Sequence, residues 1–227
     1  MTVKQAVRGI AVSVAFMAAL GACAGGAGSG GEQTGRPNGD SLEGHEEAVG
    51  VSLTAEQVRV ALPPPAGLPE GWSTGGAPTV QDGTEAAERC GFATGTGCAG
   101  AVAYGLKSLE GEERVASTGD GAPLYINVYS FDSAENAKVA FKGLTAQERR
   151  EDGSDTRPLK IATGTEETDA YFEDRAYGFS ADVMIRLGGV VVHIWAMELA
   201  EADLVAPVAK LQIDRIKKMA EGKNPDA

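Results

Sequence analysis

The chain has 227 residues, with 20 lysines and arginines against 32 aspartates and glutamates, so its formal net charge is -12. Hydrophobic residues make up 43% of the chain and charged residues 23%, which excludes a wholly disordered protein. The acidic balance argues against a nucleic-acid partner, because no basic surplus is present to neutralise phosphates. Three cysteines and two histidines leave little material for a metal site, and we expect neither a metal nor a cofactor.

Residues 1–22 have the pattern of an export signal. Lys4 and Arg8 precede an apolar stretch of 12 residues, which is too short to span a bilayer. Leu20-Gly21-Ala22-Cys23 then matches the lipobox of bacterial lipoproteins, which implies that Cys23 carries the lipid and becomes the new N-terminus. Two or three acyl chains, such as palmitate, anchor a protein stably to the membrane. The alternative is a secreted protein whose cysteine falls there by chance.

The segment 23–50 is predicted to be the lipidated cysteine followed by a flexible linker. It contains nine glycines and almost no large apolar side chains, so it cannot bury enough surface to offset its chain entropy. Residues 51–219 are then long enough for one folded domain, and 220–227 are expected to form a disordered tail. The domain is thereby placed outside the cell membrane, on the extracytoplasmic face.

The folded part begins with a predicted helix at 53–62. Thr54 and Gln57 have the spacing of a capping box, and three consecutive prolines from Pro63 end the helix. Further along, Cys90 and Cys98 flank a short glycine-rich loop. They are the thiols left once Cys23 is lipidated, and an oxidising compartment favours a disulfide between them. A redox role is disfavoured because the spacing is not C-x-x-C.

Two strands are predicted at 101–106 and 124–131, and a helix follows the second strand. Asp132 is the predicted N-cap of that helix, with Glu135 at the matching position. Its apolar positions recur at helical spacing, namely Ala137, Ala140, Phe141 and Leu144. A charged loop at 149–158 and a short strand around Tyr171-Phe172 complete this region.

The strongest local pattern is a hairpin, with strands at 179–187 and 190–198 joined by Gly188-Gly189. A two-residue turn pairs aliphatic residues on one face: Leu187 with Val190, Ile185 with Val192, and Val183 with Ile194. The opposite face is mixed, with the pairs Arg186–Val191, Met184–His193, Asp182–Trp195 and Ser180–Met197. The strand at 124–131 shows the same split. We therefore predict an α+β fold in which an antiparallel sheet is covered on one face by helices, including a last helix at 203–219.

The mixed sheet face is the candidate binding site. Seven side chains are predicted to lie near one another there and to contact an unknown small molecule or envelope protein: Tyr125, Tyr129, Asp182, Met184, Arg186, His193 and Trp195. Aromatic residues, methionine and arginine are enriched in the energetically important parts of interfaces. The alternative is that a loop such as 149–158 covers this face and the polar groups are structural.

Several segments together resemble a set of actinobacterial surface lipoproteins and, more loosely, the PknH-like extracytoplasmic sensor domain of mycobacterial kinases. The segments are Leu53-Thr54 with Gln57, Leu68-Pro69 with Gly71-Trp72, the strand and helix from Tyr125 to Ala137, and the hairpin from Arg186 to Val192. The resemblance covers residues 51–219. It implies an antiparallel sheet backed by helices, with a cleft that binds a ligand. The kinase sensor domain has two disulfides, whereas this chain can form one.

The chain contains no motif of a known catalytic nucleophile, zinc protease or P-loop. His193 and Asp182 lie diagonally across the predicted hairpin, within reach of each other. That pair could serve as a general base, or it could be a strand histidine hydrogen-bonded to an acid. A non-catalytic, sensor-like binding module is therefore the preferred interpretation. The alternatives are an extracytoplasmic hydrolase that uses His193 and Asp182, and a structural envelope lipoprotein.

Overall fold

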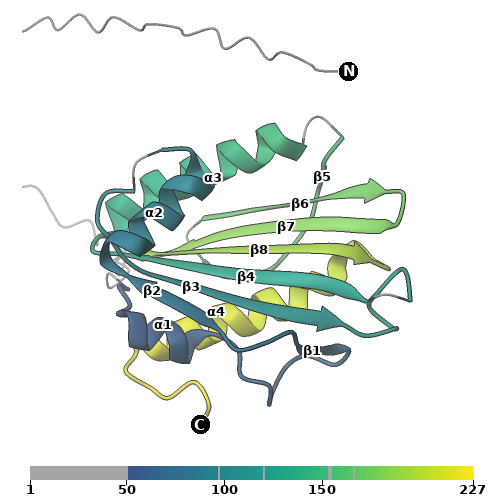
Figure 1. Ribbon diagram of the computed structural model, residues 1–227, viewed down its shortest axis with the longest axis horizontal. Coiled ribbons are helices and arrows are strands. Elements are labelled where there is room, and N and C mark those ends of the chain that lie inside the picture. Colours follow the sequence, from purple (N-terminus) through teal and green to yellow (C-terminus); the bar gives the residue numbers. More distant parts are fainter. Residues whose placement is uncertain (1–50, 97, 120, 153–154, 166) are drawn as a thin grey trace, which may run out of the picture. The chain divides into compact units, whose positions relative to one another are not determined.

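The computed structural model describes residues 51–227, except 97, 120, 153–154 and 166. The predicted signal peptide, the lipobox with Cys23 and the linker lie outside the described residues. In the part of the chain that is described, no helix is long and apolar enough to cross a membrane. The folded body is an antiparallel sheet with helices packed on it (Figure 1).

The sheet has eight strands in the described chain, and neighbouring strands run antiparallel. Their order is β1-β3-β4-β8-β7-β6-β5, and β2 pairs with β3. The strands are β1 Trp72–Thr74, β2 Thr79–Asp82, β3 Ala101–Gly111, β4 Ala122–Phe131, β5 Arg157–Pro158, β6 Glu167–Arg175, β7 Gly178–Leu187 and β8 Val190–Leu199. The hairpin β7–β8 therefore lies in the middle of the sheet, between β4 and β6.

Helices pack on both faces of the sheet. The helices are α1 Ala55–Ala61, α2 Gly83–Thr94, α3 Ala134–Asp152 and α4 Ala206–Ala220, and a 3-10 turn at Ala202–Val205 leads into α4. In Figure 1, α2 and α3 lie on one side of the sheet and α1 and α4 on the other. The predicted α+β class with an antiparallel sheet is confirmed. The prediction that helices cover only one face is wrong, because α2 and α3 form a second helical layer on the mixed face. That face also carries large apolar side chains, which the second layer buries.

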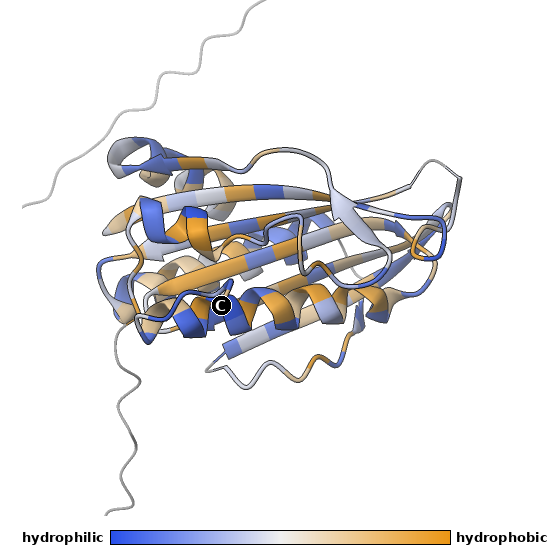
Figure 2. Cartoon of the chain, turned by 90° about the horizontal axis from the view of Figure 1, so that it is seen from below, coloured by the Kyte–Doolittle hydropathy of each residue, from blue (hydrophilic) through white to orange (hydrophobic). Residues whose placement is uncertain are grey.

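The main core lies between the aliphatic sheet face and the helices α1 and α4. Ile126, Ile185 and Ile194 are almost fully buried there and pack with Val208 and Ile213 of α4. Figure 2, seen from the α4 side, shows the alternation of apolar and polar residues along the strands and the apolar residues of the helix. The aliphatic pairs predicted from the hairpin pattern are thus the centre of this core.

The β7–β8 register agrees with the predicted turn. Leu187 is paired with Val190, and Asp182 with Trp195, as a two-residue turn requires. The pairing then shifts, because Ala181 faces Ala196 whereas Phe179 faces Leu199. The predicted Ser180–Met197 pair is therefore wrong: a β-bulge places one extra residue in β8.

Two boundaries around α3 differ from the sequence prediction. The N-cap is Ser133 rather than Asp132, since the Ser133 hydroxyl accepts a hydrogen bond from the Asn136 backbone N–H at 3.3 Å. Asp132 instead accepts a hydrogen bond from the Asn136 side chain at 2.7 Å. The helix also continues to Asp152, so the first part of the predicted loop 149–158 is helical. At α1, the predicted capping box of Thr54 and Gln57 is confirmed.

The last residues lie against α4, where the sequence predicts a disordered tail. Arg215 is buried, and its Nη1 lies 2.7 Å from Oδ1 of Asp226. Lys218 donates hydrogen bonds to the carbonyls of Pro225 and Ala227. A buried guanidinium needs a counter-charge, and this need explains why the segment folds back.

The predicted disulfide between Cys90 and Cys98 is present, with the two Cα atoms 5.9 Å apart. It ties the end of α2 to the chain that enters β3. Closing so short a loop stabilises the folded state by about 2–3 kcal/mol in the chain-entropy model. We expect the double variant Cys90→Ser/Cys98→Ser to lose about that much unfolding free energy in urea titrations. Cys23→Ser is the matched control, and equal unfolding of the two variants would show that the disulfide adds nothing.

Candidate functional site

The mixed face of the sheet is divided into a covered part and an open part. Tyr129, Met184 and Val191 are buried in a cluster with residues of α2 and α3. The rings of Tyr129 and Tyr104 contact each other, with their centroids 5.2 Å apart. These side chains fill the space between the helices and the sheet, so this part of the face is a second core.

Tyr125 and Trp195 form the open part of the same face. They are directly paired between β4 and β8, and both are half-buried, so part of each ring remains accessible to solvent. Their rings stack with centroids 5.5 Å apart and planes inclined by 22°. Stacked aromatic rings that are partly open to solvent offer apolar contact area at little conformational cost.

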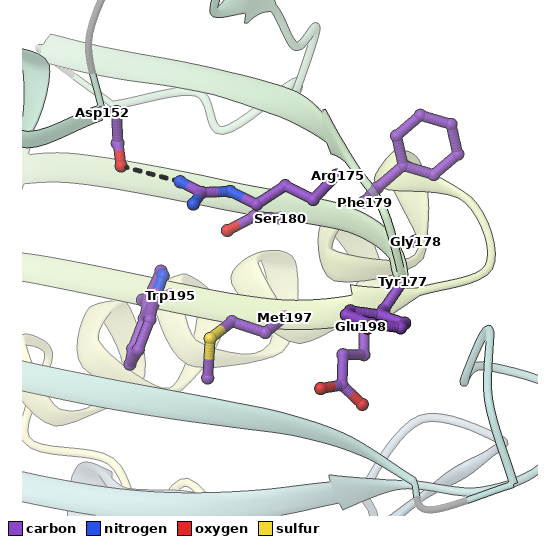
Figure 3. Close-up of a pocket in the computed structure, with 9 residues that line it drawn as sticks. All are labelled: Asp152, Arg175, Tyr177, Gly178, Phe179, Ser180, Trp195, Met197 and Glu198. Atoms are coloured by element: carbon purple, nitrogen blue, oxygen red, sulfur yellow. Dashed lines mark hydrogen bonds and ion pairs between the residues drawn. The ribbon is translucent and has the colours of Figure 1, made fainter.

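A cavity of about 190 Å³ continues from Trp195 toward the β6–β7 turn. Figure 3 shows Trp195, Met197 and Glu198 following one another along β8, with Arg175 reaching toward Asp152. The guanidinium of Arg175 lies 3.4 Å from Asp152 and forms a second ion pair with Glu173. The cavity therefore has an apolar side, made by Trp195 and Met197, and a charged side.

The β-bulge in β8 shapes this cavity. Glu198 has a positive φ of 55°, which is unusual for a residue with a side chain. Gly178, which lines the same cavity, has φ 117°, and a Cβ atom there would lie 2.7 Å from the carbonyl oxygen of Leu199. Only glycine fits at this position, so the close approach of the two strands at the cavity depends on Gly178.

A buried polar cluster lies beneath α3. Nε2 of His193 is 2.9 Å from Oδ1 of Asp182, and Nδ1 of His193 is 3.8 Å from Oε1 of Glu148. The hydroxyl of Tyr171 donates a hydrogen bond to Asp152 at 2.6 Å. The imidazole is thus held between a carboxylate from β7 and a carboxylate from α3.

The environment of this cluster perturbs several pKa values. Burial raises the pKa of Asp182, and the hydrogen bond from His193 only partly offsets that effect. Burial alone would lower the pKa of His193, but the hydrogen bond and the charge of Asp182 raise it above its ordinary value. Burial also raises the pKa of Glu148. All three shifts favour the protonated forms, so the cluster retains protons.

A second cavity, of about 280 Å³, opens beside His193 between α2, α3 and the sheet. It is lined by Arg89, Phe92, Ala93, Tyr104, Asn127, Tyr129, Gln147, Glu148, Glu151 and His193. Burial raises the pKa values of Tyr104 and Tyr129, so their hydroxyls are poor nucleophiles at neutral pH. Phe92 is 88% exposed at the rim.

The seven predicted binding residues do not form one surface. Asp182, Met184, His193 and Tyr129 lie together but are buried, whereas Tyr125 and Trp195 remain accessible. Arg186 lies at the other end of β7, near the hairpin turn, where Nε donates a hydrogen bond to Glu167 at 2.5 Å. Part of the mixed face is covered, as the alternative interpretation predicted, but the helices α2 and α3 cover it rather than a loop at 149–158.

Sequence reasoning missed Glu148 and Asp152. In α3 the apolar positions 137, 141 and 144 continue at 148 and 152 with helical spacing, so both carboxylates belong to the stripe that faces the sheet. Extending the stripe past Leu144 would have placed them on the helix face that packs on the sheet. Met197 follows from the alternation that places it on the mixed face beyond Trp195, although it was not among the seven site residues. Arg175 had no comparable signal, because the β6–β7 turn positions it.

Comparisons with known proteins give one similarity. No family model matches the chain, and no curated protein matches it. The extracellular domain of PknH from Mycobacterium tuberculosis has a similar solved structure, with TM-score 0.44 and 13% identity. The match covers 74% of this chain and 93% of that domain. The sequence motifs resemble the same kind of domain.

Proposed function

We propose that the protein is a lipoprotein of the cell membrane, anchored through Cys23, whose body is a non-catalytic binding module on the extracytoplasmic face. The lipobox and the preceding signal pattern support the anchor and the compartment. The Cys90–Cys98 disulfide fits an oxidising compartment. A glycine-rich linker then separates the module from the membrane.

The anchor has a direct test. Cys23→Ser removes the atom that would carry the lipid, so the variant should either escape into the medium or stay unprocessed. Fractionation of cells followed by detection of the protein measures this. Membrane retention and normal cleavage in the variant would contradict the lipoprotein assignment. The Cys90→Ser/Cys98→Ser variant, which keeps the lipobox, should stay on the membrane.

One observation carries the binding proposal: the stacked Tyr125–Trp195 pair lies open beside a partly apolar cavity. At about 190 Å³ the cavity is smaller than the 300–1,000 Å³ typical of sites that enclose a whole small molecule. It therefore suits one group of a larger ligand, such as an aromatic or aliphatic side chain of an envelope protein. Arg175 and Glu198 at the cavity would then contact polar atoms of that ligand.

Site-specific photo-crosslinking in living cells tests this proposal. A photoreactive residue in place of Met197 should give a discrete crosslinked product. The same residue at Val139, which is 54% exposed on α3, is the matched control and should not give that product. Adding Tyr125→Ala to the Met197 probe should abolish the product. Identical products from both positions, or none from Met197, would contradict the binding site.

A hydrolase is the second candidate, and the hydrogen bond between Asp182 and His193 favours it. The described residues that line the cavity beside His193 include two tyrosines but no serine, threonine or cysteine. The pKa shifts of those tyrosines weaken them as nucleophiles. We therefore place this candidate second. Ester hydrolysis by the wild-type protein that His193→Gln abolishes would reverse the order.

A further inference from the structure

The buried polar cluster beneath α3 contains three possible metal ligands that take no part in the aromatic binding site: Glu148, Asp182 and His193. Each offers one ligand atom, and these atoms all lie within 4.8 Å of one another. They come from three different elements, α3, β7 and β8, so the fold rather than a local motif brings them together. We propose that these three side chains bind one zinc ion, or another divalent ion of the first transition row.

The distances are close to those of a coordination site. Zinc binds imidazole nitrogen and carboxylate oxygen at about 2.0–2.2 Å, which sets tetrahedral ligand atoms about 3.3 Å apart. His193 Nε2 and Asp182 Oδ1 are 2.9 Å apart, so they need to separate by only a few tenths of an ångström. The carboxylate of Glu148 lies 3.8 Å from Nδ1, the other ring nitrogen, so the half-buried Glu148 side chain has to turn toward Nε2 to join the same ion. Metal binding thus replaces the proton that His193 and Asp182 share with an ion, and that proton is released.

The charge of the cluster favours a cation. Two carboxylates and a neutral imidazole together match the charge of one divalent ion. Two arginines near the cluster pair with other acids: Arg149 contacts Asp169, and Arg175 contacts Asp152. Arg89 of α2 lines the adjacent cavity and is the cation that an entering ion would pass. Among the ion pairs of the described chain, Asp182 and Glu148 have the imidazole of His193 as their partner and no guanidinium. An ion here would supply a full counter-charge to the buried carboxylate of Asp182.

The cavity of about 280 Å³ gives the ion a route and a fourth ligand. Glu148 and His193 both line it, so an ion that enters the cavity meets them directly. The cavity has room for water, which completes a zinc shell that has three protein ligands. The nitrogen and two oxygens suit zinc, manganese or cobalt better than calcium or magnesium, which prefer all-oxygen shells.

Calorimetric titration of the full chain with zinc chloride tests the site. The protein is purified in detergent, freed of metal with a chelator and carries His45→Gln, because His45 and its neighbouring glutamates offer a competing linker site. We expect one zinc ion per chain, with proton release that depends on the buffer. Glu148→Gln should weaken binding at least tenfold, since even outer-shell changes cost 10–100-fold. No binding by this protein would overturn the proposal.

The matched control is Glu151→Gln, which makes the same charge change on the same helix and cavity. It should change the affinity less than threefold. An equal loss in both variants would show general attraction rather than ligation and would overturn the site. If Glu148→Gln does not fold, NMR of the His45→Gln protein decides, because His193 is then its one histidine. Zinc must shift the ring signals of His193, and unshifted signals at saturating zinc would refute the proposal.

Discussion

Tyr129→Ala is expected to lower the free energy of unfolding by about 3–5 kcal/mol, the usual cost of removing a buried aromatic ring. Tyr129 is 5% exposed and packs in the cluster beneath α2 and α3. The sequence-based hypothesis of a binding surface implies the opposite, a variant with an unchanged melting temperature. Urea denaturation followed by circular dichroism measures the difference directly.

Tyr125→Ala is the matched control, because it removes the same side chain from the same strand face. Tyr125 is half-buried, and its ring stacks on that of Trp195. The loss should be clearly smaller than that of Tyr129→Ala, because a half-buried ring gives up less burial, and its contact with Trp195 adds only about 0.5–1.5 kcal/mol. If the two variants lose equal amounts of unfolding free energy, the mixed face is not divided into a covered part and an open part, and this account of the face is wrong.

Asp182→Ala is expected to cost about 3–5 kcal/mol, because it leaves the imidazole of His193 buried without its partner. Asp182 is 3% exposed and His193 is 7% exposed, so water replaces the lost hydrogen bond poorly. Unfolding titrations in a chelator-containing buffer, which keeps metal out, measure the cost. A loss below about 1 kcal/mol would mean that the pair is solvated in the native protein.

The double variant Asp182→Leu/His193→Leu is the control for this prediction. Replacing both partners of a buried pair by apolar residues is often neutral or stabilising, whereas removing one partner is not. The double variant should therefore be more stable than Asp182→Ala. If it is equally unstable, lost packing rather than the unpaired imidazole accounts for the effect.

The central hairpin could be predicted from the sequence because its information is local. Gly188-Gly189 fixes a two-residue turn, and alternation along both strands then sets which side chains face each other. The aliphatic face, the mixed face and the Asp182–His193 contact all followed from that register. The disulfide could be predicted in the same way, because Cys90 and Cys98 are close in sequence.

The layers above the mixed face could not be predicted in the same way. Whether α3 covers that face depends on packing between segments far apart in the chain. The apolar stripe of α3 shows which side of the helix is buried, but it does not determine which face of the sheet the helix packs on. The bulge at Glu198 is also a tertiary effect, since it adds one residue to a strand whose alternation looks regular. The cavity beside Trp195 therefore had no signal in the sequence.

A crystal structure of the protein extracted from its own membrane, without refolding, would test the central claim most directly. The account predicts density for a retained group against Tyr125 and Trp195, in the cavity that Met197 and Arg175 line. It predicts that side chains of α2 and α3, and no bound group, contact Tyr129 and Met184. A structure in which a segment of the same chain covers Tyr125 and Trp195, or in which only water contacts them, would contradict the account.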